Sequence, residues 1–143
     1  MNSGSFELKT FRRNIGQNWY HIVLTPRARF PVFQYRDQRE LALAAFDWVC
    51  ERHKIEVHTK EVMEDHVHLF VSCPPDHSIR RLISILKGGS SYYIRKHRPQ
   101  LQKYPSLWGR GAMYRSVGAV SAEIIERYIE KNVWGDRFQK KLI

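Results

Sequence analysis

The sequence predicts an α+β fold, namely a ferredoxin-like (RRM-like) antiparallel sheet with helices on one face and an additional C-terminal helix. Segments with strand and helix character follow one another in the order β-α-β-β-α-β-α. No linker rich in glycine, serine or proline divides the chain. We therefore expect residues 1–143 to form a single domain, with residues 1–16 as a loosely held basic arm.

The first half of the chain contains the first three predicted strands and one helix. Residues 18–26 are rich in β-branched and aromatic side chains, and Pro26 ends this strand. Residues 36–54 have apolar side chains at helical spacing. Residues 54–64 and 65–73 read as consecutive strands, so we expect them to pair as a hairpin. The helical stripe consists of Leu41, Ala44, Ala45, Trp48 and Val49, and the side chains expected on one side of the second strand are Ile55, Val57, Thr59, Glu61 and Met63.

The second half contains two more helices around a short strand. Ser78 is a plausible N-cap for a helix over residues 79–98. Residues 112–118 are a strand candidate, and Ser121 is expected to cap a last helix that ends near Gly135. The apolar stripe of the first of these helices is Ile79, Leu82, Ile83, Leu86 and Tyr93.

The net charge of the chain indicates what kind of molecule it binds. The chain has 24 Lys and Arg against 14 Asp and Glu, a net charge of +10. Such an excess favours a polyanion such as nucleic acid as partner, although a basic surface can also serve solubility alone.

The cysteines and the apolar runs indicate the compartment. Cys50 and Cys73 are too few for a disulfide framework, and neither a signal peptide nor a membrane-spanning run is present, so we expect a cytoplasmic protein.

Two histidines stand one residue apart in the strand over residues 65–73. Because side chains i and i+2 of a strand share a face, His66 and His68 should lie side by side. Two imidazoles so placed can bind a metal ion, or they can be a hydrogen-bonded pair on a half-exposed sheet face. Phe70 stands where a histidine-triad hydrolase would have a third histidine, so a third ligand must come from elsewhere.

The last helix has a polar pair on its apolar stripe. Tyr128 and Asn132 are i, i+4 neighbours, so their side chains lie on one side of the helix. Tyr128 can be an aromatic at the edge of the core, with Asn132 simply in the last turns of the helix. Alternatively, this helix places a tyrosine nucleophile and an amide ligand against the histidine-bearing sheet.

Taken in order, these motifs resemble the single-tyrosine HUH transposases, the small transposases of insertion sequences, and their relatives the repeat-associated tyrosine transposases. The resemblance extends from about Trp19 to Asn132. It includes "YHIVLTPRARFPVF", "DHVHLFVSCPP", "IRRLISILKGGSSYYIRK", "LWGRGAMYRSVG" and "IERYIEKN".

The resemblance implies that His66 and His68 are metal ligands and that Tyr128 is the nucleophile. The family usually has Gln four residues after the tyrosine as third ligand, and here this position is Asn132. The implied activity is cleavage and rejoining of single-stranded DNA next to hairpins through a 5′-phosphotyrosine, with Mg²⁺ or Mn²⁺ as cofactor. The implied assembly is a homodimer with active sites shared between subunits.

Basic side chains that could hold DNA phosphates occur after the first strand and along the second helix. They are Arg27, Arg29, Arg80, Arg81, Lys87 and Arg95. Gly88 and Gly89 interrupt that helix, either for close approach of a DNA backbone or for tight helix packing. Aromatic side chains that could stack on unpaired bases, or belong to the core, are Tyr92, Tyr93, Tyr104 and Trp108.

Two other functions compete with an active transposase. One is a domesticated relative that cuts chromosomal repeat hairpins. The other is a catalytically silent hairpin-binding protein, which Asn132 in place of Gln favours and the presence of both histidines and Tyr128 opposes.

Overall fold

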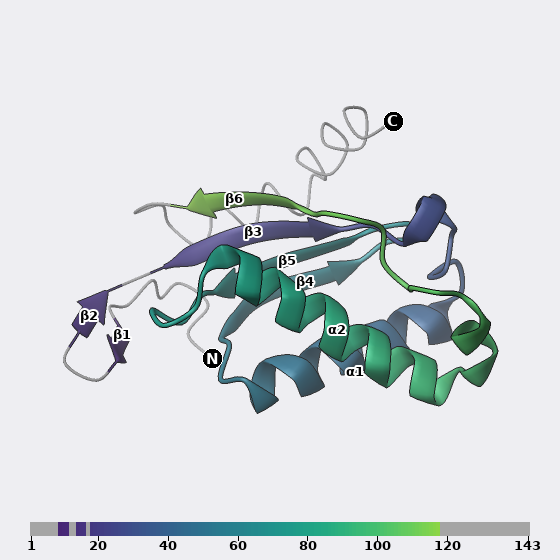
Figure 1. The fold of residues 1–143 in the computed structure, drawn as a ribbon, viewed down its shortest axis with the longest axis horizontal. Coiled ribbons are helices and arrows are strands. Elements are labelled where there is room, and N and C mark those ends of the chain that lie inside the picture. The colour runs from purple at the N-terminus through teal and green to yellow at the C-terminus, as the bar shows by residue number, and fades with distance from the viewer. Residues whose placement is uncertain (1–8, 12–13, 17, 118–143) are drawn as a thin grey trace.

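The computed structural model describes residues 9–11, 14–16 and 18–117 (Figure 1). The predicted order of strands and helices is confirmed over this part of the chain. The main elements are β3 (Trp19–Leu24), α1 (Arg36–Arg52), β4 (Val57–Val62), β5 (Val67–Ser72), α2 (Ile79–His97) and β6 (Met113–Val117). The predicted last helix, with Tyr128 and Asn132, lies outside the described residues.

The sheet has four antiparallel strands in the order β4-β5-β3-β6. The predicted hairpin is present, because β4 pairs with β5. The first strand of the α/β unit, β3, is central and pairs with β5 on one side and β6 on the other. This is the arrangement of a split β-α-β fold, which confirms the predicted fold class.

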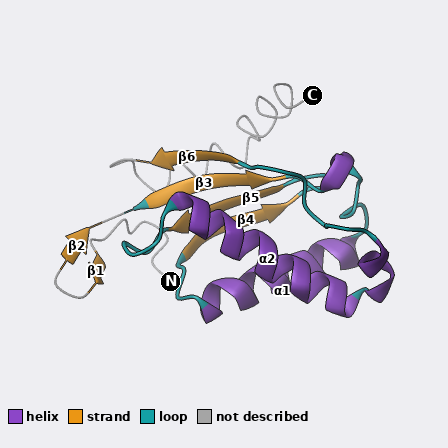
Figure 2. Cartoon of the chain, viewed as in Figure 1, coloured by secondary structure: helices purple, strands orange, loops and turns teal. Residues whose placement is uncertain are grey.

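The domain has two layers (Figure 2). Both helices cover one face of the sheet, and the core fills the space between them and that face. The sheet contributes Ile22, Leu24, Val67, Leu69 and Val71 to this core, and the helices contribute Ala45, Phe46, Val49, Leu82 and Leu86. Alternate residues of β3 and β5 therefore belong to the opposite face.

Helix α1 buries most of the predicted stripe, since Ala45 and Val49 are in the core and Leu41 and Trp48 pack against it, but the stripe is shifted. Ala44 is exposed, whereas Ala42 and Phe46 are fully buried together with Ala45 and Val49. The stripe is rotated by about one residue because Phe46 packs inward against Trp108. In α2 the predicted stripe is largely confirmed, since Leu82 and Leu86 are buried and Ser78 caps the helix by accepting from the Arg81 amide.

Strand β4 does not keep the alternation predicted for it. A β-bulge interrupts the register between Val57 and Thr59. A bulge inserts one extra residue and thus exchanges the faces of the side chains on its two sides. As a result both Val57 and Val62 pack against the core, and His58 is buried.

The basic arm contains two short strands that were not predicted from the sequence. Within residues 1–16, β1 (Lys9–Phe11) pairs antiparallel with β2 (Asn14–Gly16) as a separate two-stranded sheet. Over the described residues, no helix is both long enough and apolar enough to cross a lipid bilayer.

Candidate active site

The candidate site lies on the sheet face that α1 and α2 do not cover. In the register of β3 and β5, Val23 is opposite His68 and His21 is opposite Phe70. Directly opposed residues of an antiparallel pair share a face. His21, His68 and Phe70 are therefore on one face, while their neighbours Ile22 and Leu69 belong to the core on the other.

His66 and His68 lie side by side, as the sequence predicted. His66 directly precedes β5, and its Nε2 is 2.9 Å from Nε2 of His68, with the two rings nearly perpendicular at 82°. Both rings are buried, with exposed fractions of 5% and 1%. Two nitrogens 2.9 Å apart share one proton in a hydrogen bond, or they bind one cation together.

Asp65 orients the ring of His66. Its Oδ1 is 2.9 Å from Nδ1 of His66, and its Oδ2 accepts a hydrogen bond from Nη2 of Arg29 at 2.9 Å. Burial alone would raise the pKa of Asp65, but the hydrogen bonds from His66 and Arg29, and then their charges, hold this pKa below its usual value. Asp65 is thus an ionised acceptor that keeps the proton of His66 on Nδ1 and leaves Nε2 directed toward His68.

Arg29 reaches Asp65 from a backbone turn of unusual conformation. The turn η1 (Arg27–Arg29) places Ala28 at φ 53° and Arg29 at φ 55°. A left-handed conformation costs a non-glycine residue about 1–2 kcal/mol. Two such residues in succession, the second of which is the arginine that binds the carboxylate behind His66, are consistent with strain retained for a functional geometry.

His21 contacts His68 on the side away from His66. Its Nε2 is 3.3 Å from Nδ1 of His68. Burial, and secondarily the nearby charge of Arg115, lowers the pKa of His21 to about 4, so the ring is neutral near pH 7. A neutral imidazole can accept a hydrogen bond from His68. His21 was not among the site residues predicted from the sequence, although a histidine between Trp19 and Val23 on an apolar strand was a detectable signal.

The two Nε2 atoms fit the binding of a divalent cation. Nitrogens in adjacent positions of an octahedron, each about 2.1 Å from the metal, lie about 3.0 Å apart. The observed 2.9 Å matches this requirement. A metal-bound histidine usually donates its other ring N–H to a carboxylate or carbonyl, and Asp65 is so placed beside Nδ1 of His66. Residues 9–11, 14–16 and 18–117 contain no group of three or more His, Cys, Asp or Glu that could complete a site.

The six predicted DNA-binding residues differ in exposure and in the groups they contact. Arg27, Arg80 and Arg81 are exposed. Lys87 donates to the carbonyl oxygens of Gly109 and Gly111, and Arg95 donates to those of Gln102 and Tyr104, so both hold loops in place. Arg29 binds Asp65. Phosphate contact remains a prediction for all six.

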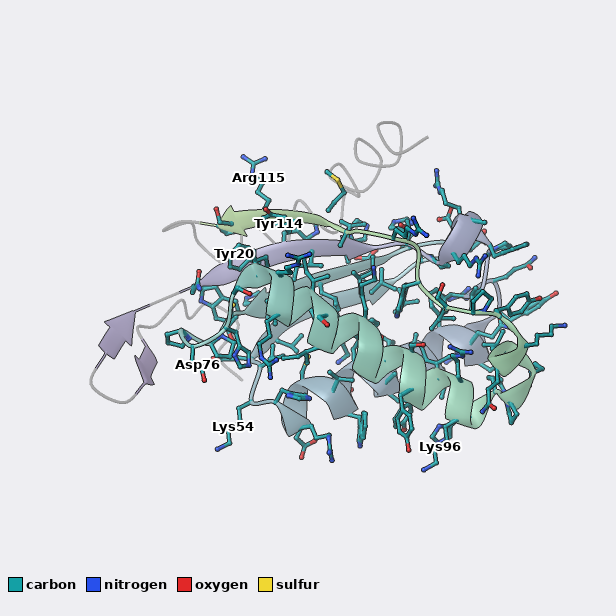
Figure 3. All side chains as sticks on the ribbon, in the orientation of Figure 1. Tyr20, Lys54, Asp76, Lys96, Tyr114 and Arg115 are labelled. Atoms are coloured by element: carbon teal, nitrogen blue, oxygen red, sulfur yellow. The ribbon has the colours of Figure 1, made fainter. Side chains whose placement is uncertain are left out.

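One further arginine lies on the histidine face. Arg115 of β6 is opposite His21 in the register and thus shares its face. Figure 3 shows Arg115 pointing away from the sheet on the side opposite the helices. Arg115 was not predicted from the sequence, because a single arginine on a short strand has no distinctive spacing.

The four aromatic side chains that could stack on bases differ in burial. Trp108 is buried, and its Nε1 donates to Ser90 Oγ at 2.9 Å, which is a core role. Tyr93 is half-buried against the core. Tyr92 and Tyr104 are exposed at 58% and 42% and remain available for stacking.

A cavity of about 580 Å³ does not include the three histidines in its lining. It is formed by the turn after β3, the start of α1 and the segment after α2, with Phe30, Leu41, Ile94 and Leu101 among its lining. None of His21, His66 and His68 lines it. Its mainly apolar walls offer no set of groups for the chemistry of the histidine site.

Fold and site together define an α+β protein with a buried histidine pair on the sheet face that α1 and α2 do not cover. Residues 14–132 match the family described as "Transposase IS200 like". Since the match extends over most of the 143 residues, the chain belongs to the IS200-like transposase family.

Individual relatives agree with this assignment. The transposase for insertion sequence element IS200 of Salmonella typhimurium is 29% identical over 126 residues, 86% of this chain and 82% of that protein. The ISDra2 transposase TnpA of Deinococcus radiodurans is 30% identical over 127 residues, 87% of this chain and 90% of that protein.

Solved structures show the same fold. A crystal structure of a provisionally assigned transposase from Deinococcus radiodurans R1 matches with a TM-score of 0.69 and 25% identity, over 86% of this chain and 96% of that one. A REP-associated tyrosine transposase bound to a REP hairpin matches with a TM-score of 0.55 over 78% of this chain and 64% of that one. Its identity of 13% shows the fold alone.

Proposed function

We propose that this IS200-type transposase cleaves and rejoins single-stranded DNA next to a hairpin, with Tyr128 as nucleophile. The observation that carries the proposal is the buried pair of Nε2 atoms of His66 and His68, 2.9 Å apart, in a chain of this family. Two relatives add support, since one is named a tyrosine transposase and was solved on a hairpin, and another is named for an insertion sequence.

His66 and His68 would hold a divalent cation, Mg²⁺ or Mn²⁺, with the amide of Asn132 as third ligand. When bound, the cation supplies Lewis-acid polarisation of the scissile phosphate and neutralises its developing charge. Asp65 keeps His66 in the tautomer that presents Nε2 as a lone-pair donor.

The covalent step conserves the energy of the bond that is cut. The hydroxyl oxygen of Tyr128 attacks phosphorus and loses its proton, and the bond from phosphorus to the 3′-oxygen breaks. The leaving 3′-oxygen takes up a proton and becomes a free 3′-OH. Attack by another 3′-OH on the phosphotyrosine reverses the step, joins the new end and returns the proton to Tyr128, so no nucleotide cofactor is needed.

The decisive test is formation of a covalent adduct. Wild-type protein incubated with hairpin-bearing single-stranded DNA and Mg²⁺ or Mn²⁺ should give a protein–DNA band on a denaturing gel. Tyr128→Phe should lose this band but retain hairpin binding, because only the hydroxyl forms the ester. Tyr92→Phe removes the hydroxyl of an exposed tyrosine on α2 and should keep the band. Binding without any adduct in the wild type would instead identify a silent hairpin-binding protein.

The role of Asn132 can be separated from that of Tyr128. Asn is one methylene shorter than Gln, so the amide reaches less far by roughly 1.5 Å. Asn132→Ala should raise the metal concentration that cleavage requires, and Asn132→Gln should leave cleavage similar or improve it. An unchanged metal requirement in Asn132→Ala would exclude the amide as a ligand.

We propose further that the active enzyme is a homodimer in which the histidines of one subunit work with Tyr128 of the other. His66→Ala and Tyr128→Phe should each be inactive alone, and a mixture of the two should regain cleavage if subunits exchange. A monomer in light scattering, or a mixture that stays inactive after co-refolding, would contradict shared sites.

A further inference from the structure

We infer that His21 is a positioning residue, which sets the tautomer and the ring orientation of the metal ligand His68. This inference rests on the proposed function in one respect, the binding of a cation by His68. The observation is the contact from Nε2 of His21 to Nδ1 of His68, at 3.3 Å between strands β3 and β5. Residues His21 and His68 are 47 positions apart in the chain.

The two rings meet edge to edge. Their planes are nearly parallel, at 3°, and their centroids are 5.4 Å apart. The closest nitrogens are only 3.3 Å apart and thus lie between the two centroids. Rings stacked face to face would not place these atoms in that way, so the geometry is that of an in-plane hydrogen bond.

His68 is therefore held at both of its nitrogens. His66 lies at its Nε2 edge and His21 at its Nδ1 edge. Because the two edges of an imidazole diverge, His21 cannot reach a cation placed between the Nε2 atoms of His66 and His68. Its role is to act on His68.

The position of the proton on His68 decides which of the two rings donates the hydrogen bond. A neutral imidazole has one N–H, and a metal-bound Nε2 must offer a lone pair, so the proton of His68 is on Nδ1. That N–H then donates to Nε2 of His21. His21 does for His68 what Asp65 does for His66, so each proposed ligand has its own partner at Nδ1.

Both rings of this contact are buried. His68 is 1% exposed and His21 is 5% exposed. An apolar side chain at position 21 would leave the Nδ1–H of His68 without this acceptor in a buried place. A competing reading is that His21 merely fills the sheet face, as a ring of similar size would.

Calorimetric titration with Mn²⁺ separates the two readings. His21→Phe keeps a ring but removes the acceptor, and we expect it to weaken Mn²⁺ binding by about 10–100-fold. His21→Gln can place an amide oxygen near the position of Nε2, and we expect its Kd to stay within a few-fold of wild type. His58→Phe is the matched control, because His58 is also buried on this sheet and packs against Trp19 and Phe70, at 6.3 and 5.2 Å between ring centroids.

A second readout reports the tautomer directly. Long-range ¹H–¹⁵N spectra of the Mg²⁺-saturated protein should show the proton of His68 on Nδ1 in the wild type and in His21→Gln. A signal from a Nδ1–H that exchanges slowly with water should be lost or broadened in His21→Phe.

The Mn²⁺ titrations distinguish failure of the inferred role of His21 from failure of the proposed metal site. Equal Mn²⁺ affinity in His21→Phe and wild type would overturn the inference while leaving the proposed metal site intact. An equal loss in His58→Phe, or no recovery in His21→Gln, would also overturn it, since packing would then explain the effect. If wild type and His66→Ala bind Mn²⁺ equally weakly, the proposed metal site itself fails, and the role of His21 fails with it.

Discussion

Arg29 and Asp65 are joined by a 2.9 Å ion pair, although they are 36 positions apart in the chain. Both side chains are about one-third exposed or less, at 27% and 31%. Ion pairs of this exposure contribute at most about 1 kcal/mol to stability. The main effect of the pair is to fix the position of the Asp65 carboxylate, whose other oxygen contacts His66.

We predict that Asp65→Ala weakens divalent-metal binding by about 10–100-fold and lowers the free energy of unfolding by about 1–3 kcal/mol. His66 would lose the acceptor that fixes its Nδ1–H. Calorimetric titration with Mn²⁺ measures the first quantity and urea unfolding the second. Asp37→Ala, which breaks the Arg98–Asp37 pair elsewhere on the surface, should leave Mn²⁺ binding unchanged. Equal Mn²⁺ affinity in wild type and Asp65→Ala would show that Asp65 does not support the ligand.

The two neighbouring glycines of α2 should respond to alanine in opposite ways. A Cβ at Gly88 would meet nothing within 4 Å, so Gly88→Ala should stabilise the protein by up to about 1 kcal/mol through helix propensity. A Cβ at Gly89 would lie 2.5 Å from Cγ2 of Val49 on α1, and Gly89→Ala should destabilise by about 1–3 kcal/mol. Urea unfolding of both variants measures the difference. Similar effects of the two substitutions would rule out tight packing of α1 on α2 as the reason for Gly89.

DNA binding should weaken steeply with salt if the charge of +10 serves phosphate contact. Each phosphate neutralised contributes a slope of about −0.7 on single strands and about −0.9 on duplex. Arg80→Gln and Arg81→Gln remove exposed charges at the start of α2, and each should flatten the slope by roughly one such unit. Fluorescence anisotropy of a labelled hairpin over a salt series provides the slopes, with Lys103→Gln as a charge-matched control. Slopes unchanged in both arginine variants would place the DNA elsewhere.

Stability of the metal-free protein should fall as the pH is lowered from about 6.5 to about 4. The pKa of His21 is lowered from 6.5 to about 4, mainly by burial, so the unfolded chain binds a proton in this range while folded His21 does not. Proton uptake by the unfolded state favours unfolding, by on the order of 3 kcal/mol across the interval. Urea unfolding at several pH values should show a smaller fall in His21→Phe than in wild type. Parallel curves for the two proteins would contradict the assignment to His21.

The histidine pair was predictable because it depends only on local geometry. The alternation of a strand places His66 and His68 on one face wherever the strand pairs. The order of the elements was predictable for the same reason, since Ser78, the apolar stripes and Pro26 are local signals.

Features that depend on contacts across the fold were not predictable in this way. The bulge at Val57 changed which side chains of β4 are buried, and Phe46 rotated the buried stripe of α1 toward Trp108. His21 and Arg29 owe their roles to partners 47 and 36 residues away. The sequence shows these residue types, but only the register between β3 and β5 and the turn after β3 bring them to the site.

The central place of β3 also constrains the order of folding. Residues 19–24 pair with β5 at residues 67–72 and with β6 at residues 113–117. During synthesis the β4–β5 hairpin can form from local contacts, and β3 can then join it. The other edge of β3 stays unpaired until roughly 90 further residues have been synthesised and β6 is available, and closing such a long loop is slow. Until β6 emerges, that edge can pair with a strand of another nascent chain, so mutations in residues 113–117 should lower the yield of folded protein during expression.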